Sequence, residues 1–483
     1  MGSKLTPLID SKLHRKVLHL NKTLLRFLLF VGLAAVLAAS SGTRQPNVVF
    51  IALDDLNDWP GFMRRYPDAM TPHMDRLAGK GMTFDRAHIQ YPICGPSRAS
   101  IFSGFQPGTL RGFDRMKDSG VDAATEQLGS RLLHQWFRDH GYKTMAVGKL
   151  MHNHVPRSSV DLSGGRGDWN KMPDGKRVNW HSSGTSTDWG PYPGDDAQMS
   201  DHRAATWAVE RLGENHEKPF MLMVGFIRPH VPWHVPQEWF DRYPADKPLT
   251  TPPYKPDDWD DLPKASRQVN LHPDMPRTEW AIQQNKWQEI IRAYLASITF
   301  ADHQVGRVLD ALERSPYAGN TLIVLWSDHG YHMGEKNTFQ KHSLWERSSH
   351  VPLIFAGPGI KPGSRCDRVV SLLDLYPTLS EYCGVPSNPK NEGRSLLPLL
   401  KEPTREWNFP ALTEWRDQNY AVQTERFRYI RYKDGTEELY DHRVDLTEWR
   451  NLAGDDDYKS VKADLAGHVP PIVAFKPSRR DGQ

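Results

Sequence analysis

The sequence predicts an α/β protein with one large, mainly parallel sheet between helices, followed by a smaller α+β subdomain. Short, continuous apolar runs of strand length alternate with longer helical patterns up to about residue 350. Such runs are typical of strands buried on both faces, as in parallel sheets. After Pro352 the pattern changes to shorter segments and turns, which indicates the second unit.

Each element follows from its own pattern. The apolar runs predict strands at 47–53, 144–147, 220–224, 322–326 and 353–355, and helical spacing predicts helices at 127–140, 204–212 and 287–312. The subdomain is expected to contain a helix at 372–382, a loop at 384–394 and strands at 427–432 and 438–440. Between the last two strands, Lys433-Asp-Gly435 is a hairpin signal. We therefore expect domains at 46–360 and 361–483, preceded by a segment at 1–39.

Residues 1–39 have the pattern of an export signal. Basic residues between Lys12 and Arg26 precede an apolar run at 27–39, which is shorter than the roughly 20 residues of a membrane span. We expect cleavage near Ala38 or Ala39 and a periplasmic or secreted protein. The alternative is an uncleaved N-terminal membrane anchor. No later stretch has spanning length, so no other membrane contact is expected.

Charge and cysteine content limit the possible functions. Lys plus Arg number 61 and Asp plus Glu number 58, and the net charge of +3 gives no reason to expect a nucleic-acid partner. Of three cysteines, Cys366 and Cys383 either pair in an oxidising compartment or are two separate core residues. Cys94 then lacks an obvious partner, and an odd cysteine in an exported protein requires an explanation.

Polar residues gather where several predicted strands end. They are Asp54 and Asp55, Lys149 and His152, Arg228 and His230, and Asp328 and His329. In open α/β sheets the ligand crevice lies beyond the carboxyl ends of the strands, so these side chains are expected to converge. Two irregular inserts rich in Gly, Pro, Asp and Trp, at 157–196 and 232–277, are expected to form the walls of the crevice.

The segment Cys94-Gly-Pro-Ser-Arg98 resembles the C-x-P-S-R core of the type I sulfatases. The motifs that accompany this core in the family occur here in the same order: Asp54-Asp55, Gly148-Lys149-Leu-Met-His152, Pro229-His230, Ser327-Asp328-His329-Gly330 and Lys341. Each motif alone is a weak sign, since paired Asp residues commonly cap helices and loop His and Lys residues are commonly solvated. The ordered set is far more specific.

The resemblance implies an alkaline-phosphatase-like fold and a formylglycine (3-oxoalanine) made from Cys94 by a formylglycine-generating enzyme. It also implies one calcium ion. Asp54, Asp55 and Asp328 offer the oxygen ligands that calcium prefers, and residue 94 would be a further ligand. His329 would ligate the ion, contact sulfate, or do both.

The remaining family positions imply roles in handling the sulfate ester. Arg98 would hold the formylglycine hydrate or the metal-site carboxylates, and Lys149 and Lys341 would contact sulfate oxygens. His152 would remove a proton from the formylglycine hydroxyl to expel sulfate, and His230 or Lys341 would protonate the departing alcohol. The expected cycle places sulfate covalently on residue 94 and releases it by carbon–oxygen cleavage.

Three features resemble the iduronate-2-sulfatase branch: Pro229-His230-Val-Pro232, the single His of Lys149-Leu-Met-His152 and the segment at 419–424. They imply an exo-acting enzyme on a sulfated saccharide. Candidate contacts to an anionic sugar are Arg228, Trp233, His234 and Arg416. The alternatives are a formylglycine-dependent phosphodiester or phosphonate monoester hydrolase, and a catalytically silent protein that binds sulfated glycans.

Overall fold

The computed structural model describes residues 2, 45–168, 180 and 184–472. The predicted export signal and its cleavage site lie outside these residues. The chain from Pro46 onward forms one compact unit. Within the part of the chain that the structure describes, no helix combines the length and apolar character of a membrane span.

A nine-stranded mixed sheet forms the centre of this unit, in the order β11–β2–β10–β8–β1–β6–β3–β4, with β9 beside β2. The strands are β1 (Asn47–Asp54), β2 (Met82–His88), β3 (Lys143–Gly148), β4 (Leu162–Gly165), β6 (Phe220–Pro229), β8 (Thr321–Ser327), β9 (His350–Val351), β10 (Leu353–Ala356) and β11 (Ser364–Ser371). Strands β8, β1, β6, β3 and β4 are parallel, whereas β10 is antiparallel to both of its neighbours.

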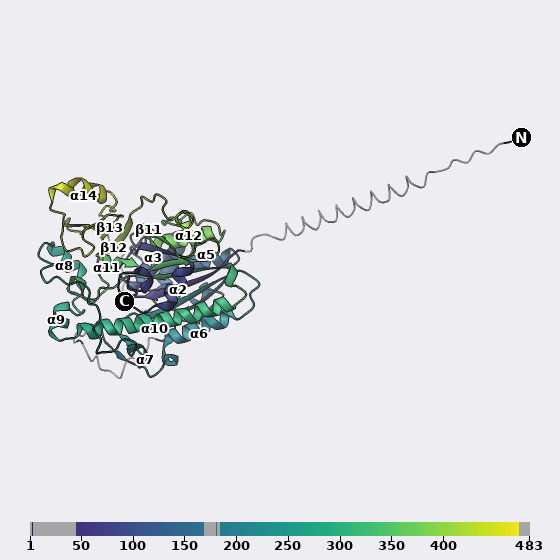
Figure 1. Ribbon diagram of the computed structural model, residues 1–483. Coiled ribbons are helices and arrows are strands. Elements are labelled where there is room, and N and C mark those ends of the chain that lie inside the picture. Colours follow the sequence, from purple (N-terminus) through teal and green to yellow (C-terminus); the bar gives the residue numbers. More distant parts are fainter. Residues whose placement is uncertain (1, 3–44, 169–179, 181–183, 473–483) are drawn as a thin grey trace, which may run out of the picture. The chain divides into compact units, whose positions relative to one another are not determined.

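Helices cover both faces of this sheet (Figure 1). Alternate residues of β1 point to opposite sides: Val49 and Ile51 pack in the core beneath α2 (Pro72–Lys80), α6 (Ser200–Leu212) and α10 (Trp287–Arg314). Val48 and Phe50 pack in the core beneath α3 (Cys94–Ser103), α5 (Leu133–Asp139) and α12 (Leu375–Tyr382). Because both faces are buried, β1 is apolar from Val48 to Leu53, and burying each large side chain contributes about 1.5–3 kcal/mol.

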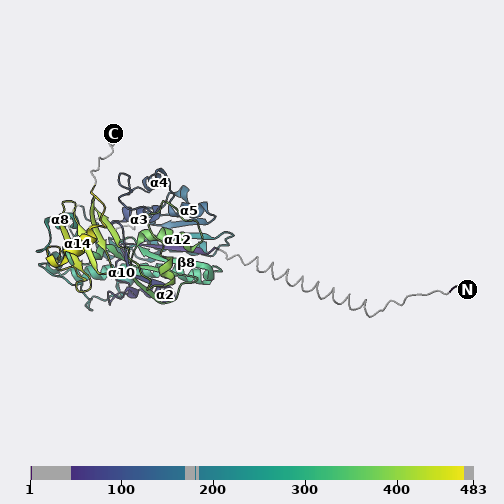
Figure 2. The ribbon, with the colours of Figure 1, turned by 90° about the horizontal axis from the view of Figure 1, so that it is seen from above.

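A separate four-stranded antiparallel sheet follows. It consists of β12 (Ala411–Trp415), β13 (Asn419–Gln423), β14 (Phe427–Arg431) and β15 (Glu437–Asp441). Helix α14 (Lys459–Ala466) packs against this sheet through a small core that includes Leu465 and Tyr429, and it lies beside the sheet in Figure 2. Although β11 and α12 come after residue 360, β11 pairs with β2 of the large sheet and α12 packs in its core.

Shorter elements connect these parts. They are α4 (Asp118–Gln127), α7 (Gln237–Phe240), α8 (Lys264–Asn270), α9 (Thr278–Gln283), α11 (Glu346–Ser349), α13 (Leu397–Lys401), and the paired strands β5 (Trp189–Pro191) and β7 (Trp233–Val235). All five predicted strands of the main domain are present, as is the predicted hairpin turn at Gly435 (φ 88°). The predicted helix at 127–140 is wrong in its first part, because Gly129 is left-handed (φ 71°) and separates α4 from α5.

Candidate active site

The site begins at the end of β1. Asp54 is the last residue of this strand, and Asp55 turns the chain with a left-handed backbone (φ 64°), which Asp tolerates better than most residues. The Asp55 N–H donates to Oδ1 of Asp328 (3.2 Å), and its carbonyl accepts a hydrogen bond from the Tyr294 hydroxyl (2.7 Å). This turn places both carboxylates beside the residue that follows β8.

Cys94 is the first residue of α3 and is only 3% exposed. Its Sγ lies 3.1 Å from Nζ of Lys341 and 3.2 Å from Nε2 of His329. Burial, followed by the negative charge of Asp54, raises the pKa of the thiol to about 12, although Lys149 and Lys341 act in the opposite direction. The unmodified side chain is therefore a neutral thiol, which is a poor nucleophile.

Arg98 lies one turn further along α3 and is fully buried. Its Nε donates to Asp328 (2.7 Å), and its two terminal nitrogens donate to the carbonyls of Lys149 (2.7 Å), Leu150 (3.0 Å) and Leu53 (3.2 Å). One guanidinium thus joins the ends of β1, β3 and β8. Of the two roles expected for Arg98, this geometry corresponds to holding the carboxylates.

Two lysines pair with the carboxylates of β1. Lys149 Nζ contacts Asp54, and Lys341 Nζ lies 2.8 Å from Oδ1 of Asp55. Two glycines, Gly148 (φ 80°) and Gly225, allow the backbones of β3 and β6 to approach closely, and this lets Lys149 turn inward. A Cβ on Gly148 would lie 1.8 Å from the Gly225 carbonyl oxygen.

The two Asp side chains differ in electrostatic environment. Burial raises the pKa of Asp54, but Lys149, His230 and Arg98 outweigh it and hold the pKa well below its usual range. Burial also raises the pKa of Asp55, and Lys341 and His329 do not fully offset it, so this pKa stays above its ordinary value. Among the described residues, Oδ2 of Asp55 has no hydrogen-bond partner. This oxygen is a free ligand atom in a buried site.

The same residues could hold a metal ion. Asp54, Cys94, Asp328 and His329 each offer one atom, and these atoms lie within 4.8 Å of one another; Asp54, Asp55, Cys94 and His230 form an overlapping group. Three of the six residues in the two groups are carboxylates, and carboxylate oxygens suit a hard divalent cation such as calcium or magnesium.

A cavity of about 270 Å³ opens above this cluster. Five of the predicted site residues line it: Cys94, Lys149, His152, His230 and Lys341. The remaining predicted members of the cluster, Asp54, Asp55, Arg98, Asp328 and His329, are fully buried next to it. Ser186 and Met275, which belong to the two inserts predicted to form the crevice walls, also line the cavity. Sequence reasoning missed Ile93, Val231, Tyr331, Gln340 and His342. Several of these directly adjoin motif residues, which was the only available signal.

The four predicted sugar contacts are not in the wall of this cavity. Arg228 is buried and donates to the carbonyls of His230 (2.8 Å) and His234 (3.1 Å), so it holds the loop after β6. Trp233 is fully buried and packs against aromatic core residues. His234 hydrogen-bonds the Gly190 carbonyl, and Arg416 donates to the Gln268 carbonyl (2.7 Å).

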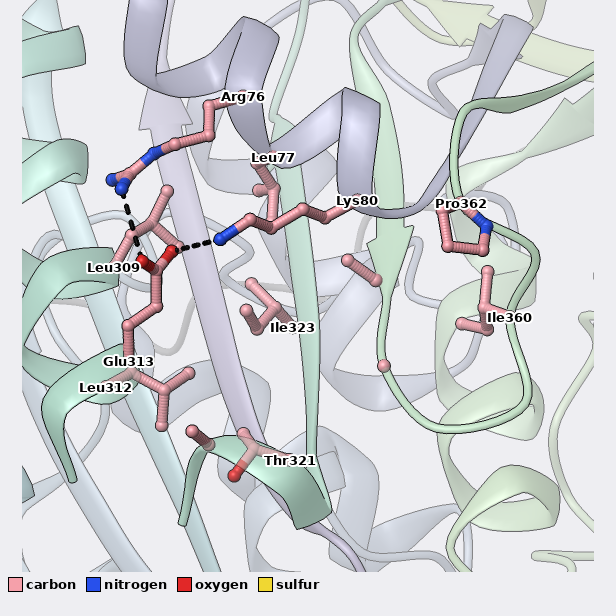
Figure 3. Close-up of a pocket in the computed structure, with 13 residues that line it drawn as sticks. Arg76, Leu77, Lys80, Leu309, Leu312, Glu313, Thr321, Ile323, Ile360 and Pro362 are labelled. Atoms are coloured by element: carbon pink, nitrogen blue, oxygen red, sulfur yellow. Dashed lines mark hydrogen bonds and ion pairs between the residues drawn. The ribbon is translucent and has the colours of Figure 1, made fainter. Parts of the chain in front are cut away.

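Two further features lie away from the cluster, and the first concerns the two interpretations of the cysteine pair. Cys366 and Cys383 are separate buried thiols in the core rather than a disulfide. A larger cavity of about 340 Å³ lies near Thr321, at the opposite end of β8 from Asp328 (Figure 3). Its one carboxylate, Glu313, is paired with Arg76 and Lys80.

The sulfatase family model matches residues 46–385. The chain belongs to the sulfatase family. It is therefore a sulfuric ester hydrolase, as the motifs predicted.

A second family model, N-sulphoglucosamine sulphohydrolase, C-terminal, matches residues 334–472. A sulfatase of Formosa agariphila is 42% identical over 93% of this chain and 92% of its own length. Human iduronate 2-sulfatase is 27% identical over 83% of this chain and 87% of its own length.

Solved structures confirm the alkaline-phosphatase-like fold of this sulfatase. A 2-O GAG sulfatase superposes with a TM-score of 0.69 and 24% identity, covering 88% of this chain and 91% of its own. Phosphonate monoester hydrolase of Agrobacterium radiobacter superposes with a TM-score of 0.68 and 22% identity, covering 87% and 94%. The fold is thus equally similar to enzymes named for two different esters.

Proposed function

We propose that this sulfatase removes sulfate from a sulfated saccharide, using formylglycine derived from Cys94 and one calcium ion. The observation that carries the proposal is the position of Cys94. Its Sγ lies at the cavity surface between Lys341 and His329, directly beside three buried carboxylates. Formylglycine at this position would supply, as its hydrate, the oxygen nucleophile that the neutral thiol does not provide.

Asp54, Asp55, Asp328 and His329 would hold the calcium ion. The fit rests on the carboxylate-rich donor set and on Oδ2 of Asp55, which is buried without a partner among the described residues. The ion would supply positive charge to the nucleophile and to the sulfate oxygens. The three carboxylates are already matched by Arg98, Lys149 and Lys341. A dication therefore leaves an excess of positive charge, which favours binding of an anionic ester.

The position of each remaining site residue supports a particular role in the reaction. Lys149 and Lys341 line the cavity and would contact sulfate oxygens. His152 also lines it, and its buried Nδ1 has no partner among the described residues, which supports a role in moving a proton at residue 94. His230 Nε2 lies 3.9 Å from Asp55 and faces the same cavity, so His230 or Lys341 would protonate the departing alcohol. Arg98 orients Asp328 without reaching substrate.

The cavity supports action on one terminal sugar. A volume of about 270 Å³ is at the small end for a ligand site and suits a single sulfated ring. The relatives' names point to sulfated uronic acid and glucosamine units, and the similarity to human iduronate 2-sulfatase favours the uronate. Export through residues 1–39, and maturation by a formylglycine-generating enzyme, are parts of the same proposal.

Two measurements test the proposal. Peptide mass spectrometry of active enzyme should find an aldehyde in place of the thiol at residue 94, and unmodified cysteine in fully active enzyme would refute the mechanism. The second candidate, a phosphonate monoester hydrolase, is favoured only by fold similarity. Comparing kcat/KM for 4-nitrophenyl sulfate and a 4-nitrophenyl phosphonate monoester separates the two, and the sulfate ester should be the better substrate.

A further inference from the structure

His342 is a polar residue in the cavity wall that the proposed mechanism does not use. It directly follows Lys341, it is 8% exposed, and its Nδ1 is shielded from water without a hydrogen-bond partner among the described residues. A buried, unpaired ring nitrogen is unfavourable unless a partner arrives from outside the chain. In a binding cavity, that partner is substrate.

The ring of His342 is held in place on both sides. It stacks on Trp415 (centroids 5.6 Å apart, 24° between planes) and lies 5.0 Å from the ring of His272. Trp415 ends β12 and donates to the Val269 carbonyl (2.7 Å), and the N–H of His272 donates to the side chain of Gln340 (2.9 Å). Because two aromatic side chains pack against the imidazole and fix its position, the ring can respond to a ligand only through its nitrogens. The four-stranded sheet thereby contributes to the cavity through Trp415.

The charge of His342 limits what it can recognise. Burial and then the adjacent Lys341, with His272, His329 and Arg416 adding to them, lower its pKa well below the ordinary value. The neutral ring has one N–H donor and one nitrogen acceptor. This pair complements a hydroxyl group, which also donates and accepts, whereas a carboxylate or a second sulfate can only accept.

We propose that His342 is a specificity-determining residue that hydrogen-bonds a hydroxyl group on the sugar ring that carries the sulfate. The inference rests on the proposed function and extends it. Since Lys341 would contact the sulfate, its neighbour His342 is placed to contact the ring close to the ester. A substrate without ring hydroxyls would not use this contact.

The test compares a sugar with an aryl ester. His342→Phe keeps the stacked ring and removes both nitrogens. Its kcat/KM for a uronic acid 2-sulfate should fall about 10-fold or more, and its kcat/KM for 4-nitrophenyl sulfate should fall several-fold less than that. His342→Gln, which retains a donor and an acceptor, should recover part of the loss. His303→Phe is the matched control, because His303 also contacts an aromatic ring (Trp239, 5.2 Å) but lies on α10 and does not line the cavity.

Monodeoxy analogues of the sugar sulfate identify the hydroxyl. Wild type should discriminate against one analogue, and His342→Phe should hydrolyse that analogue and the parent sugar at similar rates. An equal fall for the sugar and the aryl ester would overturn the proposal, as would undiminished discrimination by His342→Phe. If wild type hydrolyses neither sulfate ester, the proposed function itself has failed, which is a different result from a loss confined to the variant.

Discussion

Two buried charge clusters flank the loop that follows β8, and they are built differently. The catalytic cluster is formed by Asp54, Asp55, Cys94, Arg98, Lys149, His230, Asp328, His329 and Lys341. The interface cluster, which links this loop to the four-stranded sheet, is formed by Asp58, Glu346, Arg347, His350, Arg428, His442 and Glu448. Lys341 belongs to the first cluster, and Glu346 to the second.

The carboxylates show the difference. Burial raises the pKa of Glu346, but Arg428 and then His88 outweigh it and hold the pKa well below its usual range. The pKa of Asp55 stays raised, and Oδ2 of Asp55 lacks a partner within the described part of the chain. In the interface cluster, Asp58, Glu346 and Glu448 each pair with an arginine and a histidine, so the role of this cluster is to hold the loop. In the catalytic cluster, the charge of Asp55 is not fully compensated and its Oδ2 makes no hydrogen bond to the described residues, as expected of a site that binds ions.

The largest effect should come from Cys94→Ala. If the nucleophile is derived from this residue, kcat/KM for a sulfate ester should fall by on the order of 10⁴-fold or more. The midpoint of thermal unfolding should change little, because one small side chain replaces another. Cys383→Ala, at a buried core thiol outside the cavity, is the matched control and should retain turnover. Normal turnover by Cys94→Ala would exclude the proposed chemistry.

Next comes Arg428→Met, which breaks the interface cluster. Arg428 is fully buried, pairs with Glu346 and Glu448, and donates to the Leu344 carbonyl (2.9 Å). Removing one partner from a buried pair costs about 3–5 kcal/mol, because it leaves uncompensated charge. Urea unfolding should show this loss. Arg426→Met is the control: the Arg426 side chain is 43% exposed, although its partner Asp441 is buried, so its removal should cost less than that of the fully buried Arg428. Equal losses in the two variants would show that the cluster is not stabilising.

Asp55→Asn should lower activity without lowering the stability of the fold. Asn also tolerates the left-handed backbone and keeps an oxygen acceptor for Lys341, but it removes a buried charge that lacks full compensation. The metal-free variant should therefore unfold at the same or a higher temperature than wild type, while kcat/KM falls about 100-fold or more.

Calcium provides the control for that variant. A ligand at 100 times its Kd stabilises the folded state by about 2.7 kcal/mol. Thermal unfolding of wild type, after treatment with a chelator, should shift upward when calcium is added, and Asp55→Asn should shift less. Identical calcium shifts in both proteins would remove Asp55 from the ligand set.

The smallest expected effect is the pH dependence of Asp58→Asn. Burial raises the pKa of Asp58, but Arg347 and His350 outweigh it and lower the pKa below its ordinary value. A lowered carboxyl pKa stabilises the fold above the unfolded-state value of about 4 and ceases to do so as the pH falls through the folded-state value. The difference in unfolding free energy between wild type and Asp58→Asn should therefore shrink below about pH 4. If the difference in unfolding free energy did not change with pH, the charge of Asp58 would not be its cause.

The sequence predicted the central strands well, because strands buried on both faces are continuous apolar runs. It missed β2 and β11, where the half-buried Arg86 and the exposed Asp367 interrupt that pattern. β11 is the outer strand of the sheet, where charged side chains remain in water. The antiparallel direction of β10 was also not visible, since strand direction depends on how the chain returns to the sheet.

The site residues found from sequence share one property: each belongs to a short motif with its own local signature. The cavity residues that were missed, such as Ile93, Tyr331 and His342, are chain neighbours of motif residues, but nothing in their own sequence shows that their side chains face the cavity. The type of a residue did not predict whether its side chain points into the cavity. Trp233 and Arg228 are of types that bind sugars and anions, yet both are turned into the protein, where they stabilise the loop after β6.

The burial of Cys94 determines whether another enzyme can modify this residue before or after the chain folds. A side chain that is 3% exposed, at the base of a cavity of about 270 Å³, cannot enter the active site of another enzyme while the sheet is assembled around it. Its neighbours in the cluster come from positions as far apart in the chain as Asp54 and Lys341, so the site closes only after most of the chain has been synthesised. If Cys94 is converted to formylglycine, as we propose, the conversion therefore has to precede folding. A chain that folds first would be stable, correctly shaped and permanently inactive.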